Sequence, residues 1–321
     1  MMRSGQLILA ISGLLLLSTI GCDGSHSSTL CAIPRDPSEL PYVIQHAGMA
    51  RAAARLGMNV YWNGPRGGDD TQQQIELLEH AIEQRDAGIV ITPMAAFALD
   101  TVIQRALSER IPVVILGAAI PFPPDPNLSF VVTDIERSAR IAADRMCSGM
   151  RHPGEIAVIG VDPVTPGNSA LANAFETSMS ACPSVTRVVR KIGGTLGQSR
   201  ETVIQLLSEH PDLEGIYALS SRATLDAVAA LEATHRADSV RIVGTDPNLD
   251  LMEFLRHGSV DSLVFPNMRA MGEQSVENIA RLRKHLPVGP VTLFSPVLVT
   301  PDNIDSDSVR SLLNPDWRPV P

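Results

Sequence analysis

The sequence GIVITPMAAFALDTVIQRALSERIPVVIL, residues 88–116, decides the fold class of this chain. Two short apolar runs rich in Val and Ile predict buried strands at about 88–92 and 112–116. The segment between these runs predicts a helix over about 96–109. A strand, a helix and a second strand in this order form the unit from which parallel α/β sheets are built.

The same alternation extends from this unit toward both ends of the chain. A first series continues with strands at about 29–34, 58–62 and 129–132 and with helices at about 41–56, 71–85 and 134–149. A second series has strands at about 155–160, 186–192, 215–219 and 240–244, with helices at about 169–180, 198–209 and 222–234. It ends with a short helix near 249–256, a strand near 261–265, a long helix near 269–286 and a last strand near 294–300. Two similar α/β series predict two Rossmann-like lobes with parallel sheets, and a ligand cleft where the carboxyl ends of their strands face each other.

The start of the chain has the order of a secretory signal peptide. A basic residue precedes the apolar stretch 7–17, and small residues follow it. The sequence LLLLSTIGC ends at Cys22 and resembles the bacterial lipobox, although Thr19 occupies a position where that motif usually has Leu. We therefore expect residues 1–21 to be removed, Cys22 to carry lipid, and residues 22–28 to form a short tether in the periplasm or at the cell surface. An ordinary signal peptide with an incidental cysteine is the alternative.

The remaining cysteines have no spacing typical of a metal site. Cys31 falls in a predicted buried strand, whereas Cys147 and Cys182 both lie at the ends of predicted helices. An oxidising compartment would permit a disulfide between the latter two. A pair of inert free thiols is the other interpretation.

The charge and the motifs argue against several classes of function. A formal net charge of −9 argues against a nucleic-acid partner, because such proteins usually have basic patches. The chain contains no GxSxG, P-loop, HExxH or CxxC motif, and its eight His residues are scattered singly. Without a nucleophile, an acid–base pair or a set of metal ligands, the sequence predicts no enzyme, no cofactor and no metal site.

Several stretches, taken in order, resemble the type I periplasmic binding proteins, the ribose and galactose binders whose fold is shared by LacI-type effector domains. They are GMARAAARLGMNVYW (48–62), GIVITP (88–93), RIPVVIL (110–116), VVTDIERSARIAADRM (131–146), VRIVGTD (240–246) and VTPDNID (299–305). A LacI-type repressor would need a DNA-binding helix-turn-helix before the first lobe, where this chain has its signal sequence. The resemblance implies the binding subunit of an ABC-type importer, a monomer that delivers a sugar-like ligand to a membrane permease. A sensing module that signals to a membrane receptor is the alternative.

The resemblance also implies three crossovers between the lobes, which together form a hinge. They are expected near 132–135, 264–267 and 296–299. The N-terminal lobe then comprises 29–132 plus 266–297, the C-terminal lobe 133–265 plus 298–304, and the tail 305–321. The prolines of the tail predict an extended segment on the surface, and closure of the hinge around ligand is the expected motion.

Two residues match ligand positions of that family. Tyr42 matches an aromatic position of the first helix, with plain packing as the alternative, and Asp246 matches a ligand-contacting Asp, with helix capping as the alternative. Other polar residues are expected in loops that face the cleft, with solvated loop residues as the alternative: Arg35, Asp36, Asn63, Asp134, Asn168, Ser220 and Arg222.

Most of the remaining sugar-contacting positions are changed. Sugar-binding members usually carry Asn, Asp, Arg or Gln at these positions, whereas this chain has Leu40, Thr92, Gly117, Leu171, Ser220 and Pro266. A buried hydroxyl without a partner costs about 1–3 kcal/mol, so a simple sugar in the usual pose would bind weakly. As an alternative to a solvated loop residue, Arg35 or Arg222 could clamp a carboxylate or a phosphate by paired hydrogen bonds, which would suit an acidic or modified ligand.

Overall fold

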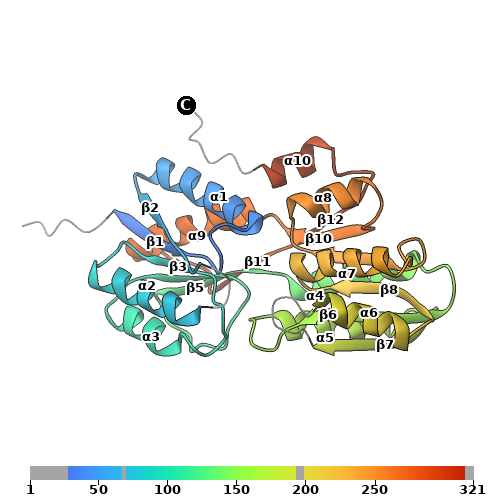
Figure 1. The fold of residues 1–321 in the computed structure, drawn as a ribbon. Coiled ribbons are helices and arrows are strands. Elements are labelled where there is room, and N and C mark those ends of the chain that lie inside the picture. Colours follow the sequence, from blue (N-terminus) through green and yellow to red (C-terminus); the bar gives the residue numbers. More distant parts are fainter. Residues whose placement is uncertain (1–27, 67–69, 193–198, 315–321) are drawn as a thin grey trace, which may run out of the picture.

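The computed structural model describes residues 28–66, 70–192 and 199–314 (Figure 1). The predicted signal peptide 1–21 and the lipid-attachment candidate Cys22 lie outside these residues, as do residues 315–321 of the tail. Within the described part of the chain, two six-stranded sheets form two lobes that lie side by side (Figure 1). The α/β fold class with two mainly parallel sheets is confirmed.

The first sheet has the strand order β11-β5-β4-β3-β1-β2, and all of its pairs are parallel. Its strands are β1 (Thr29–Ile33), β2 (Asn59–Trp62), β3 (Ile89–Ile91), β4 (Val113–Gly117), β5 (Leu128–Thr133) and β11 (Val291–Phe294). The helices of this lobe are α1 (Leu40–Leu56), α2 (Thr71–Glu83), α3 (Asp100–Ser108) and α9 (Met268–Arg283). Buried side chains of α1 and α9 pack on one face of the sheet and those of α2 and α3 on the other. Both faces are covered, which explains why its central strands are apolar throughout.

The second sheet has the order β12-β10-β9-β8-β6-β7, with only β12 antiparallel to its neighbour among the described pairs. Its strands are β6 (Gly154–Val161), β7 (Val185–Ile192), β8 (Leu213–Ala218), β9 (Arg241–Thr245), β10 (Ser262–Pro266) and β12 (Pro296–Val299). The helices are α4 (Ile135–Ser148), α5 (Asn168–Met179), α6 (Ser199–Glu209), α7 (Ser221–Ala233), α8 (Leu249–Arg256) and α10 (Asp307–Leu313). Helices α4 and α5 cover one face, and α6, α7 and α8 cover the other.

The chain passes between the two sheets three times. The passages follow β5 at Thr133, β10 at Pro266 and β11 at Phe294. The last passage corrects the expectation of one strand over 294–300, because β11 pairs with β5 in the first sheet whereas β12 pairs with β10 in the second. One apolar run thus supplies the edge strands of both lobes, and apolar periodicity alone does not show such a change of sheet.

Part of the tail is helical, where its prolines predict an extended segment. Helix α10 begins after Ser306, whose hydroxyl accepts a hydrogen bond from the backbone N–H of Val309. Val309 is buried, and Leu313 packs against the apolar core of the second lobe. Burial of these two side chains explains why the segment before Pro315 folds onto the lobe.

Helices α1 and α9 approach each other closely enough for their backbones to touch. A Cβ atom on Gly48 would lie 2.0 Å from the carbonyl oxygen of Arg269, and one on Gly272 would lie 2.1 Å from that of Gln45. Any side chain at either glycine would force the helices apart. This contact therefore fixes the position of the N-terminal half of α1.

The structure pairs Cys147, at the end of α4, with Cys182, just after α5, in a disulfide. Their Cα atoms are 5.8 Å apart, and the two helices pack along each other. Among the described cysteines, Cys31 is free, and burial next to Asp86 raises the pKa of its thiol to about 12. A thiol with that pKa stays protonated and unreactive at neutral pH.

No described helix is both long enough and apolar enough to span a membrane.

Replacing Cys147 and Cys182 together by Ser should lower the free energy of unfolding by about 4 kcal/mol, because the bridge constrains the unfolded chain across 35 residues. Urea denaturation under oxidising conditions measures the difference. Dithiothreitol should destabilise the natural protein and leave the double variant unchanged. Equal midpoints for the two oxidised proteins would show that the bridge does not stabilise the fold.

Candidate functional site

A cavity of about 830 Å³ lies between the two lobes. Its walls come from the loops that follow the carboxyl ends of strands in both sheets. They include Arg35 after β1, Thr92 after β3, Asp162 after β6, Ser220 after β8 and Asp246 after β9. The volume falls within the usual range for small-molecule sites, about 300–1,000 Å³.

All but two of the residues predicted to face the cleft line this cavity. They are Arg35, Asp36, Tyr42, Asn168, Ser220, Arg222 and Asp246. Asn63 is absent from the lining, and its amide bonds to the hydroxyl of Tyr61 and the backbone N–H of Gly64. Asp134 is also absent, because its carboxylate caps α4 by accepting a hydrogen bond from the backbone N–H of Arg137. These two side chains stabilise local structure.

Three of the lining residues shape their own loops. Asn168 donates to the carbonyl of Gly160 and accepts from the N–H of Asp162, so its amide holds the β6–α5 loop together. Ser220 caps α7, and Asp36 accepts hydrogen bonds from Ser38. These hydrogen bonds fix the conformation of loops that line the cavity.

Arg35 joins the two lobes directly. Its guanidinium donates to the hydroxyl oxygen of Thr165 at 3.1 Å, across the cavity from the first lobe to the second. The hydroxyl of Thr165 in turn donates to the carboxylate of Asp162. The chain of hydrogen bonds begins at the positive guanidinium of Arg35 and ends at the negative carboxylate of Asp162, and both charges strengthen it.

Residues on the first turns of α1 were missed by sequence reasoning. Glu39 and Gln45 lie three positions before and after Tyr42, and all three line the cavity. Gln45 is only 5 % exposed, and its side-chain oxygen accepts no hydrogen bond from the part of the chain that the structure describes. Three-residue spacing puts these side chains on one helix face, and that spacing could have identified them once Tyr42 was chosen.

The carboxylate of Asp246 is one of the uncompensated groups in the cavity. Among the described residues it has no hydrogen-bond or ion-pair partner, and Asn248 caps α8 in its place. Burial raises the pKa of Asp246 to about 6, although the nearby charge of Arg35 opposes this shift. Burial also raises the pKa of Tyr42, whose hydroxyl lies among the charges of Arg35, Asp246, Glu39 and Asp36.

The changed family positions also face this space. Thr92, Gly117, Leu171, Ser220 and Pro266 line the cavity, whereas Leu40 packs against the apolar core. Leu171 and Pro266 therefore form apolar walls of an open space and do not fill it.

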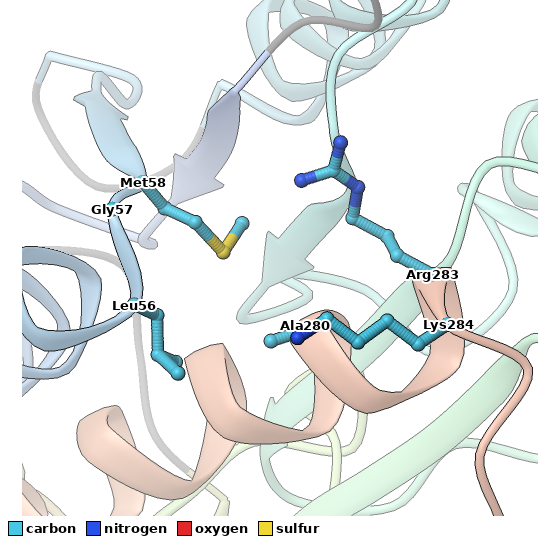
Figure 2. Close-up of a pocket in the computed structure, with 6 residues that line it drawn as sticks. All are labelled: Leu56, Gly57, Met58, Ala280, Arg283 and Lys284. Carbon is cyan, nitrogen blue, oxygen red and sulfur yellow. The ribbon is translucent and has the colours of Figure 1, made fainter.

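A second hollow, of about 240 Å³, lies at the far end of α1 (Figure 2). Figure 2 shows Leu56 and Met58 facing Ala280, Arg283 and Lys284 across it. Basic residues in the last turn of α9 suit the negative end of the helix dipole. This hollow is smaller than usual ligand sites and contains none of the predicted residues. Among the described residues, no group of three His, Cys, Asp or Glu side chains could hold a metal ion.

Comparison with known proteins gives one family match. The family model described as "Periplasmic binding protein domain" matches residues 38–285. The D-ribose/D-allose-binding protein of Pseudomonas aeruginosa is 27% identical over 62% of this chain and 63% of the relative. The xylose/arabinose-binding protein of Sulfolobus acidocaldarius is 22% identical over 83% of this chain and 66% of the relative. The matches thus span less than two thirds of each of these relatives.

Solved structures share the fold over almost their whole length. An ABC transporter solute-binding protein from Agrobacterium vitis, bound with α-D-tagatopyranose, has a TM-score of 0.82 at 17% identity, covering 88% of this chain and 98% of that one. A carbohydrate transporter solute-binding protein from Agrobacterium radiobacter, in complex with D-arabinose, has a TM-score of 0.81 at 23% identity, covering 90% and 100%. At these identities the likeness shows the fold alone.

Replacing Asp246 by Asn should stabilise the ligand-free protein at pH 7.5. A pKa raised on folding means that the carboxyl group supports the fold below pH 4 and loses that contribution as pH rises through about 6. The amide carries no charge and tolerates the positive φ of 59° at this position. The free energy of unfolding should rise by roughly 1–3 kcal/mol at pH 7.5, with no gain at pH 4.

Urea denaturation at the two pH values measures this change. The exposed Asp250 at the start of α8 provides the control, because Asp250→Asn should leave stability nearly unchanged at both. An Asp246→Asn variant with the same gain at pH 4 and pH 7.5 would contradict the assignment.

Proposed function

Because the chain belongs to the periplasmic binding protein domain family, we propose that it is an exported solute-binding protein whose lobes close around a small polar molecule. The observation that carries this proposal is the cavity of about 830 Å³, whose walls come from both lobes. The matched relatives are named as binding proteins for ribose, allose, xylose and arabinose, so the ligand belongs to the sugars or their derivatives. The role is binding and not catalysis.

The ABC-type import context is proposed from the solved structures. The Agrobacterium vitis neighbour is described as an ABC transporter solute-binding protein and the Agrobacterium radiobacter one as a carbohydrate transporter solute-binding protein, so the partner proposed here is the membrane permease of an ABC-type importer. Delivery to a permease requires a ligand that is held outside the cytoplasm and then released. The expected export signal and the two-lobed cavity suit that task.

Closure about the three passages between the sheets is the proposed working motion. The hydrogen bond from Arg35 to Thr165 connects the lobes at the cavity and favours the closed arrangement. A ligand that contacts both lobes would add to it, because it binds the closed state better than the open one.

Titration with D-ribose, D-allose, D-xylose and L-arabinose, followed by calorimetry and small-angle X-ray scattering, tests this function. Binding should reduce the radius of gyration. Thr165→Val removes the bond between the lobes, so the ligand-free variant should be more expanded and should bind about fivefold more weakly, the worth of about 1 kcal/mol.

Thr177→Val is the matched control, because Thr177 bonds within α5, away from the cavity. It should behave like the natural protein. A heat of binding without any reduction in the radius of gyration would contradict closure, while leaving ligand binding intact.

We also propose that Cys22 carries lipid and that the segment after it tethers the protein to a membrane. Cys22→Ser should abolish acylation and release the protein into the soluble extracytoplasmic fraction. Fractionation and mass spectrometry of the mature N-terminus measure both effects. A natural protein that is soluble and begins elsewhere would exclude the anchor.

A further inference from the structure

We propose that the ligand carries a protonated amine, so that the cavity takes an amino sugar or a similar polar cation in preference to a neutral or acidic sugar. This inference rests on the proposed binding function and specifies its ligand class. Both the charge of the cavity wall and its unused hydrogen-bonding groups support it.

Acidic side chains outnumber basic side chains in the lining of the cavity. Four carboxylates line it, those of Asp36, Glu39, Asp162 and Asp246, against the two guanidinium groups of Arg35 and Arg222. No lysine is part of this lining. A cavity with excess carboxylate attracts a cation and repels an anion.

The two basic side chains already have partners. Arg222 lines the cavity but is exposed, and it contacts Asp226 one turn along α7 at 3.4 Å. Arg35 donates to Thr165 and lies near Asp246 and Glu39. The protein already engages both guanidinium groups in part, so fewer of their donors are left for a carboxylate or a phosphate of the ligand.

The acidic side chains divide into used and unused groups. Asp36 accepts from Ser38, and Asp162 accepts from Thr165 and from the N–H of Val164. The side chains of Glu39 and Asp246 accept no hydrogen bond from the described residues, and the nearby charge of Asp246 adds to burial in raising the pKa of Glu39. A charge that is partly removed from water without a partner is costly, and a ligand cation would offset that cost.

Gln45 provides an independent observation. Its side-chain oxygen is buried and has no hydrogen-bond partner among the described residues, although the residue lines the cavity. An ammonium group has three donors and no acceptor, which suits the carboxylate of Asp246 and would also satisfy the Gln45 oxygen once that side chain turns toward the ligand. A metal ion would fit less well, because no three acidic, His or Cys side chains among the described residues converge as ligands.

Calorimetry at pH 7 on matched pairs of sugars tests the inference. D-glucosamine and D-galactosamine should bind at least about tenfold more tightly than D-glucose and D-galactose, a difference of about 1.4 kcal/mol. N-acetyl-D-glucosamine, in which the amine is neutral, should lose this advantage. Asp246→Asn should reduce the preference for the amine by about tenfold, whereas Asp250→Asn should retain it.

The outcomes separate this inference from the proposed function. Neutral sugars or D-glucuronate that bind as tightly as the amino sugars would overturn the inference and leave the solute-binding function standing. No heat and no thermal shift with any amino, neutral or acidic sugar would overturn both. A preference that survives in Asp246→Asn would contradict the role assigned to that carboxylate.

Discussion

The carboxyl ends of strands in one sheet meet those of the other because the chain passes three times between the lobes. Every polar group of the cavity depends on that constraint. Side chains after β1, β3, β6, β8 and β9 are far apart in sequence, yet they line one space of about 830 Å³. Parallel strands place their following loops on a common edge, so a ligand between the lobes can contact all of these loops at once.

The helix contact at Gly48 and Gly272 extends this constraint to the cavity wall. Because the backbones of α1 and α9 touch, the first turns of α1 have a fixed position. Glu39, Tyr42 and Gln45 lie at this end of α1 and line the cavity. Helix α9 begins directly after the passage between the lobes that follows β10. The packing of α1 against α9 in the first lobe therefore determines where these side chains lie in the cavity.

Sequence reasoning identified the fold because apolar strand runs and amphipathic helices repeat regularly along the chain. It failed where one run serves two sheets, as at β11 and β12, since periodicity does not reveal which neighbour a strand pairs with. It also missed the helix at Asp307–Leu313. The prolines of the tail predict an extended segment, and the sequence pattern does not show that Val309 and Leu313 pack against the core. For the site, it placed residues by loop position, and that criterion cannot show that Asn63 and Asp134 use their side chains locally.

The proposed role of Asp246 sets stability against function in this cavity. Its partly buried carboxylate lacks a partner among the described residues and raises the free energy of the ligand-free protein near neutral pH. The most direct measurement is a crystal structure of the protein saturated with its tightest-binding amino sugar. We expect closed lobes, with the ammonium nitrogen about 3 Å from the carboxylate of Asp246 and from the side-chain oxygen of Gln45. A ligand bound outside the cavity, or bound there with its amine turned away from both groups, would contradict it.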